Sequence, residues 1–124
     1  MAEFEYPRRL RLLTGGDFKR VFDKAAFKVS EQPLLILSSP NTLEHPRIGF
    51  VISKKNIRRA VKRNRVRRII RESFRLHQHQ LPNVDIVILA RRGLDELENP
   101  ELHKMIERCW SRLIKKAQKA HQKS

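Results

Sequence analysis

The chain has 124 residues, enough for one compact domain and too few for two of ordinary size. Its 28 Lys and Arg residues outnumber 13 Asp and Glu, so the formal net charge is +15. The single cysteine, Cys109, excludes a disulfide within the chain and fits the reducing cytoplasm, where we expect the protein. No apolar run approaches the roughly 18 residues of a membrane span. These features predict a soluble basic domain with a polyanionic partner.

The first predicted helix begins near a capping-box pattern. Thr14 and Asp17 stand three residues apart, as the N-cap and N3 residues of a helix do. We therefore expect a helix from Asp17 to about Lys24, with Phe18 and Phe22 on one face. Their spacing alone favours core positions, and stacking platforms for unpaired bases are the alternative.

Three segments are predicted to be strands. Residues 34–37 form a short apolar run, and Val29 begins a preceding strand or the same strand with a bend. Residues 47–53 alternate between two faces, with Phe50 on the apolar one. Residues 85–90 are almost continuously apolar, which is typical of a central buried strand.

Two further helices complete the predicted order. Asn56 is the predicted N-cap of a long helix that ends near Gln78, and residues 99–100 (Asn-Pro) open the last helix. We expect residues 1–13 and 115–124 to be less ordered. The order is one helix, two or three strands, a helix, a strand and a helix. It predicts one α+β domain that spans the whole chain.

The positive charge is concentrated in residues 54–75, which carry 11 basic side chains and one acidic side chain. On a helical wheel, an apolar stripe forms on one side: Val66, Ile69, Ile70, Ser73 and His77. Polar side chains gather on the opposite side: Asn64, Arg67, Arg68, Arg71 and Arg75. These five residues, called the ridge below, extend over roughly 16 Å at 1.5 Å per residue.

The ridge opposes helix formation in the isolated protein. Between Arg58 and Arg75, five like-charged pairs stand four residues apart. At ~0.2–0.5 kcal/mol each, they cost about 1–2.5 kcal/mol. Cations also lie at the predicted N-terminus of the helix, where the helix dipole disfavours them. Phosphate groups would reverse the sign of these interactions, so we predict nucleic-acid binding. Asn64 is almost the only base-reading side chain, which favours recognition of RNA backbone and shape.

The sequence lacks the residue groupings of a hydrolytic enzyme. The acidic side chains are scattered, and the densest group, residues 95–98, is predicted to lie in a loop. His77 and His79 would diverge by about 200° on a helix, so they cannot share a metal ion there. Cys109 lies on the apolar stripe of the last helix and is interpreted as a core residue. We predict no catalytic and no metal-ligating residue in the chain itself.

Residues 54–75 resemble the bacterial ribonuclease P protein family, which is marked by an Arg-Asn-Arg motif, here residues 63–65. Other matching segments follow in order along the chain: 8–11, 17–22, 47–49, 54–55 and 85–91. The resemblance implies a two-layer α/β sandwich of the ribosomal S5 domain 2-like type, with the motif helix in a left-handed βαβ crossover. It also implies a protein subunit that helps a catalytic RNA to remove the 5′ leader of precursor tRNA.

The resemblance, together with the ridge, predicts which residues bind RNA. The RNA-binding surface would comprise Lys54, Lys55, Arg58, Arg59, Lys62, Arg63, Asn64, Arg65, Arg67, Arg68, Arg71 and Arg75. The cleft for the single-stranded leader would comprise Phe18, Phe22 and Phe50. The aromatic residue that some members place on the floor of this cleft is absent from strand 34–37, and Phe50 is either its substitute or a core residue. Mg²⁺ would be bound mainly through the partner RNA, with no small-molecule cofactor and no membrane partner.

Two alternative functions remain open at this point. A ribosomal or other structural RNA-binding protein would fractionate with ribosomal subunits and would not respond to a 5′ leader. A protein-only nuclease would cleave RNA without an RNA subunit and would depend on an acid such as Asp85.

Overall fold

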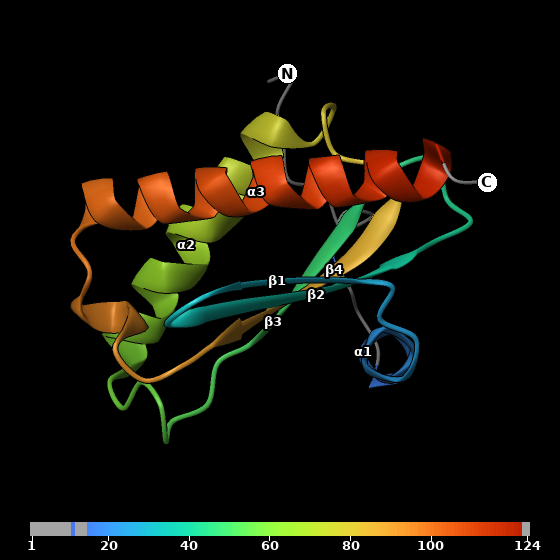
Figure 1. Ribbon diagram of the computed structural model, residues 1–124. Helices are drawn as coiled ribbons and strands as arrows, with labels where there is room; N and C mark the ends of the chain where they lie inside the picture. Colours follow the sequence, from blue (N-terminus) through green and yellow to red (C-terminus); the bar gives the residue numbers. More distant parts are fainter. Residues whose placement is uncertain (1–10, 12–14, 123–124) are drawn as a thin grey trace, which may run out of the picture.

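A single sheet separates one helix from the two longer helices on its other face. A computed structural model describes Arg11 and residues 15–122 (Figure 1). The strands are β1 (Phe27–Glu31), β2 (Leu34–Pro40), β3 (Arg47–Val51) and β4 (Val84–Ala90), in the sheet order β1-β2-β4-β3. β4 pairs antiparallel with β2 and parallel with β3. The helices are α1 (Gly15–Asp23), α2 (Ala60–His77), the short 3-10 helix η2 (Leu94–Glu96) and α3 (Asn99–Gln122). The predicted α+β class, with one sheet and this element order, is confirmed.

The main core lies between the sheet and the helices α2 and α3. Alternation along β4 turns Ile86 and Ile88 toward this side, where both are fully buried. The two helices meet at Trp110, whose indole Nε1 donates a hydrogen bond to Ser73 Oγ at 2.9 Å. The Trp110 ring also meets Phe74 edge-on, with centroids 6.2 Å apart. This contact buries an aromatic pair and satisfies the indole N–H.

Helix α1 lies on the other face of the sheet, away from α3 (Figure 1). Val21 of α1 and Val87 of β4 form the centre of a second, smaller apolar cluster. Phe18, Leu37 and Leu89 pack around them and stay partly exposed. The sheet is therefore covered fully on one face and only in part on the other.

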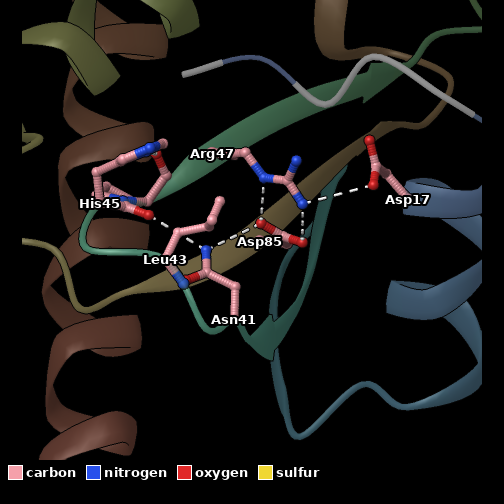
Figure 2. A network of polar contacts seen from close by, with 7 residues as sticks. Asp17, Asn41, Leu43, His45, Arg47 and Asp85 are labelled. Carbon is pink, nitrogen blue, oxygen red and sulfur yellow. Dashed lines mark hydrogen bonds and ion pairs between the residues drawn. The ribbon is translucent and has the colours of Figure 1, made fainter. Parts of the chain in front are cut away.

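A polar network ties α1 to the sheet (Figure 2). Arg47 Nε and Nη2 donate to the two carboxylate oxygens of Asp85 at 2.8 and 2.7 Å. Arg47 Nη2 also lies 3.5 Å from Asp17 Oδ1 of α1, and Asn41 Nδ2 donates to Asp85 Oδ1 at 3.0 Å. The hydrogen bond to Asp85 is the largest effect that raises the pKa of Arg47 above its ordinary value. The nearly buried Asp85 carboxylate thus joins β4 to β3 and to the loop after β2, and Arg47 extends the network to α1.

The start of α2 differs from the prediction. The helix begins at Ala60, and its N-cap is Arg59, whose side chain makes no capping hydrogen bond. Asn56, the predicted N-cap, lies in a turn and donates from Nδ2 to the carbonyl oxygen of Ala90 at 3.0 Å. The side chain fixes the loop to the end of β4 instead of capping the helix. Thr14, predicted to cap the first helix, lies outside the described residues.

Helix α3 is longer than predicted and continues through Lys115 to Gln122. Ile114 packs against the main core directly before the segment where fraying was expected, and within that segment Ala117 is half-buried. At the other end, Arg11 forms an isolated parallel bridge with Ile48, and the rest of segment 1–13 lies outside the described residues. None of the described helices is long and apolar enough to cross a membrane.

The network predicts that the Arg47–Asp85 ion pair is a large contributor to stability. Asp85→Ala leaves Arg47 without its bidentate partner in a site where the Asp85 side chain is 2% exposed. Removal of one partner of a buried pair costs about 3–5 kcal/mol in the free energy of unfolding. The exposed pair Lys19–Asp23, at 76% and 56% exposure, is the control and is expected to contribute ~0–1 kcal/mol. Urea denaturation of the single and double mutants of each pair measures the two coupling energies. Equal coupling energies for the two pairs would contradict the prediction.

The buried thiol of Cys109 is expected to be unreactive in the folded protein. Burial raises the pKa of this thiol to about 12, so almost no thiolate is present at pH 8. Iodoacetamide should modify the chain in urea and leave it unmodified in buffer, as mass spectrometry can measure. In the unfolded chain the thiol has a pKa of about 8.5. The contribution of the buried, protonated thiol to the free energy of unfolding is therefore complete below that pH and decreases as the pH rises toward 12. Rapid modification of the folded chain at pH 8 would contradict this.

Candidate nucleic-acid interface

The ridge lies on α2, and this α2 ridge is exposed because the opposite side of the helix is buried. Val66 and Ile70 are fully buried in the main core, as the helical wheel predicted. Phe74, which the wheel did not include, joins them, while His77 at the end of the helix is half-buried. On the opposite side Asn64 and Arg68 are exposed. Burial of the apolar side therefore fixes which arginines can face a partner.

The other ridge arginines lie against neighbouring groups. The guanidinium of Arg71 lies over the ring of Phe50, 5.9 Å from the centroid, where a cation–π attraction holds it. Arg75 Nη2 lies 3.8 Å from Glu72 Oε1. Together with Arg68, these side chains line an open hollow of about 260 Å³ on the surface of α2. The ridge is thus partly preorganised before any partner binds.

Only three of the five predicted like-charged pairs lie inside the helix, because α2 begins at Ala60. The repulsion within the helix is therefore about 0.6–1.5 kcal/mol, less than the sequence implied. Arg63 relieves part of the charge at the helix start, since its Nη1 donates to the carbonyl oxygens of Ile57 and Arg58 at 2.9 and 2.8 Å.

The Arg-Asn-Arg motif has different environments at its three positions. Arg65 Nε donates to Asn99 Oδ1 at 2.7 Å, and its two terminal nitrogens donate to the carbonyl oxygens of Asp95 and Leu97. All three of its nitrogens are therefore used to hold the segment before α3. Arg63 uses only Nη1 for contacts within the described residues, and Asn64 is exposed between the two. Sequence reasoning placed all three on one surface and did not separate these roles.

The loop before α2 adds a basic hollow to the interface. Ile57 anchors this loop in the main core, at 1% exposure, while Lys54 and its basic neighbours remain at the surface. A hollow of about 470 Å³ is lined by Lys55, Asn56, Arg58, Arg59, Lys62, Arg92, Gly93, Asp95 and Glu96. Arg92 was not predicted as a site residue. Because β3 and β4 are parallel, the residues that follow both strands meet at one edge of the sheet.

One of the three residues predicted to line the leader cleft lies elsewhere in the structure. Phe18 lies on the α1 face of the sheet, and Phe22 of the same helix is 44% exposed. Phe50 packs against the main core on the opposite face, under Arg71, because it alternates with Gly49 along β3. The prediction that Phe50 lines the same cleft as Phe18 is therefore wrong. The sheet presents Leu89 and neighbouring aliphatic side chains there.

Acidic and imidazole side chains are engaged in local contacts. Asp85 accepts from Arg47 and Asn41, and Asp95 lies 3.6 Å from Lys62 Nζ. His77 Nδ1 is hydrogen-bonded to the carbonyl oxygen of Ser73 at 2.8 Å, at the C-terminal end of α2. No group of three or more His, Cys, Asp or Glu side chains in the described part of the chain could hold a metal ion.

Comparisons with known proteins agree with this geometry. The profile of the family described as Ribonuclease P matches residues 6–114. The Ribonuclease P protein component of Chromohalobacter salexigens is 56% identical over 119 residues, which cover 96% of this chain and 93% of that protein. The corresponding component of Pseudomonas aeruginosa PAO1 is 50% identical over 115 residues, which cover 93% of this chain and 85% of that protein.

Solved structures give the same result at lower identity. The RNase P protein of Staphylococcus aureus superposes with a TM-score of 0.76 at 28% identity, covering 87% of this chain and 94% of that one. The RNase P protein of Thermotoga maritima superposes with a TM-score of 0.72 at 25% identity, covering 82% of this chain and 96% of that one. Profile, close relatives and fold agree along nearly the whole chain, which belongs to the ribonuclease P protein family.

Proposed function

We propose that this protein is the RNA-binding subunit of a ribonuclease P holoenzyme in the cytoplasm, where it assists a catalytic RNA in removing the 5′ leader of precursor tRNA. The observation that carries the proposal is the α2 ridge, a cationic helix face fixed in place by a buried apolar stripe. Family membership supports the identity of the RNA partner.

The chemistry of the interface suits phosphate groups. Eight of the eleven cations in residues 54–75 are arginines, whose planar guanidinium donates two parallel hydrogen bonds to one phosphate. A phosphate between neighbouring arginines replaces their repulsion with attraction, so RNA binding removes an unfavourable term of the free protein. We assign the contacts to the predicted residues of segment 54–75 except Arg65, whose three side-chain nitrogens are engaged within the protein. Asn64 and Arg68 face outward, and Arg65 supports them from within.

We assign the 5′ leader to the opposite face of the sheet. Phe22 is exposed, Phe18 is partly exposed, and Val51 at the end of β3 is 38% exposed. Aromatic rings next to an incompletely covered apolar sheet face can stack on unpaired bases without regard to sequence. On this face the strands present aliphatic side chains such as Leu37 and Leu89, and Phe50 of β3 lies on the other face, so the stacking is left to α1.

We assign the phosphodiester cleavage to the RNA and its bound Mg²⁺. The described residues do not assemble a metal site, and the most buried carboxylate, Asp85, is held by Arg47. In this proposal no catalytic step uses a metal ion held by the protein chain. In this proposal the protein neutralises phosphates, holds the leader and favours Mg²⁺ binding by the RNA.

Reconstitution tests the proposal directly. A precursor tRNA with a 5′ leader is incubated at low Mg²⁺ with the catalytic RNA alone, the protein alone, or both. We expect cleavage at the mature 5′ end only in the mixture, because the protein lowers the Mg²⁺ that the RNA requires. Gel analysis of end-labelled substrate measures the product. Cleavage by the protein alone, sensitive to Asp85→Asn, would establish a nuclease, and no effect of the protein would favour a structural RNA-binding role.

Two single substitutions should separate surface contact from internal support. Arg68→Ala removes an exposed cation, so the free energy of unfolding should change by less than about 0.5 kcal/mol. Its affinity for the catalytic RNA should fall, and the log–log salt slope should decrease in magnitude by about 0.7–0.9. Arg65→Ala removes three internal hydrogen bonds and should cost about 1–3 kcal/mol of stability. Urea denaturation and filter binding at several salt concentrations measure both, and an unchanged salt slope for Arg68→Ala would remove this residue from the interface.

A further inference from the structure

A second row of cations runs along the solvent side of α3. We call it the α3 stripe: Lys104, Arg108, Arg112, Lys115 and Lys119. All five side chains are exposed. Their spacings of four, four, three and four residues place them within an arc of about 80° at 100° per residue. The row is about 22 Å long at 1.5 Å per residue.

Edge strand β1 holds two members of the stripe in place. Arg108 Nε and Arg112 Nη1 donate to the carboxylate oxygens of Glu31 at 3.1 and 2.7 Å, and Arg112 Nη1 also donates to the carbonyl oxygen of Ser30 at 3.0 Å. A shallow hollow of about 470 Å³ beside them is lined by Lys104, Glu107, Arg108, Ser111 and Arg112. The three lysines make no hydrogen bond or ion pair with any described residue.

The α3 stripe and the α2 ridge flank opposite edges of the sheet. The stripe is attached to β1 through Glu31, whereas the ridge is attached to β3 through Arg71 and Phe50. Because the strand order is β1-β2-β4-β3, three strand spacings, about 14 Å, separate these edges. Both helices lie on the face of the sheet opposite α1 (Figure 1). The protein therefore presents two separate cationic surfaces on the same side.

Helix stability alone does not account for the stripe. Lys104–Arg108, Arg108–Arg112 and Lys115–Lys119 are like-charged pairs four residues apart, which oppose helix formation. The helix dipole favours cations only near the last turn, and Arg108 lies well before the end of α3 at Gln122. A row of cations with this spacing is complementary to the regularly spaced phosphates of a nucleic acid.

We propose that the α3 stripe binds a second segment of the catalytic RNA, so that the protein bridges two RNA segments, one on the stripe and one on the α2 ridge. This inference rests on the proposed function. The occupant is the catalytic RNA because the stripe shares its side of the molecule with the ridge, whereas the face assigned to the precursor leader lies beyond the sheet. The contact is made to phosphates and is independent of base sequence.

The test compares two variants with equal net charge. K115Q/K119Q neutralises two exposed lysines of the stripe, and K19Q/K24Q neutralises the exposed Lys19 of α1 and the exposed Lys24 directly after it, outside both surfaces. Binding of each to the catalytic RNA without substrate is measured across a salt series. We expect K115Q/K119Q to decrease the magnitude of the salt slope by about 1.4–1.8, corresponding to two lost phosphate contacts. The control variant should retain the wild-type slope.

Hydroxyl-radical footprinting then locates the contact. The wild-type protein should protect two separate RNA segments. K115Q/K119Q should lose one of them and Arg68→Ala should weaken the other. Equal slopes for both double variants, or loss of the same segment in K115Q/K119Q and Arg68→Ala, would overturn the bridging proposal.

Two further outcomes distinguish a failure of the bridging proposal from a failure of the proposed function. Unchanged RNA affinity with a raised KM for precursor tRNA would assign the stripe to the substrate and would also overturn the proposal. Failure of the wild-type protein to bind the catalytic RNA at all would instead overturn the proposed function. Circular dichroism and urea denaturation confirm that each variant folds, since all substituted side chains are exposed.

Discussion

The parallel pairing of β3 with β4 constrains the rest of this structure. Two parallel strands cannot be joined by a tight turn, so the chain must cross the sheet through a helix, here α2. The pairing places Arg47 directly opposite Asp85, and their bidentate contact closes one end of the strand pair. At the other end, the loop before α2 and the residues after β4 meet, which brings Arg92 beside Lys55.

The basic residues of α2 divide into groups with different physical roles. Arg65 donates from all three side-chain nitrogens, and Arg63 donates from Nη1, to acceptors in neighbouring segments, so both stabilise the shape of the surface. Arg68 is exposed, and Asn64 is exposed and accepts a hydrogen bond from Arg67 Nη1 at 3.1 Å. Arg71 is held above Phe50. The motif therefore combines internal support with external contact within one turn of the helix.

The two faces of the sheet differ in what they can bind. One face is sealed by α2 and α3, and the outer surfaces of these helices are cationic, which suits phosphates. The other face is covered only in part by α1 and leaves aromatic and aliphatic side chains accessible, which suits unpaired bases. In the proposed function, the sheet keeps the structured RNA and the single-stranded leader on opposite faces. The Asp17–Arg47 contact fixes the position of α1 relative to the sheet.

The element order, the buried stripe of α2 and the location of the charge could be predicted from the sequence alone, because these features depend on local periodicity and composition. The burial of Val66 and Ile70 and the exposure of Arg68 follow from the 3.6-residue repeat alone. Features that depend on contacts between distant segments could be seen only in the tertiary structure. Asn56 is hydrogen-bonded to the end of β4 instead of capping α2, and Phe50 faces away from α1. Arg92 also joins the basic hollow before α2, because the parallel pairing of β3 with β4 brings together segments that lie far apart in the sequence.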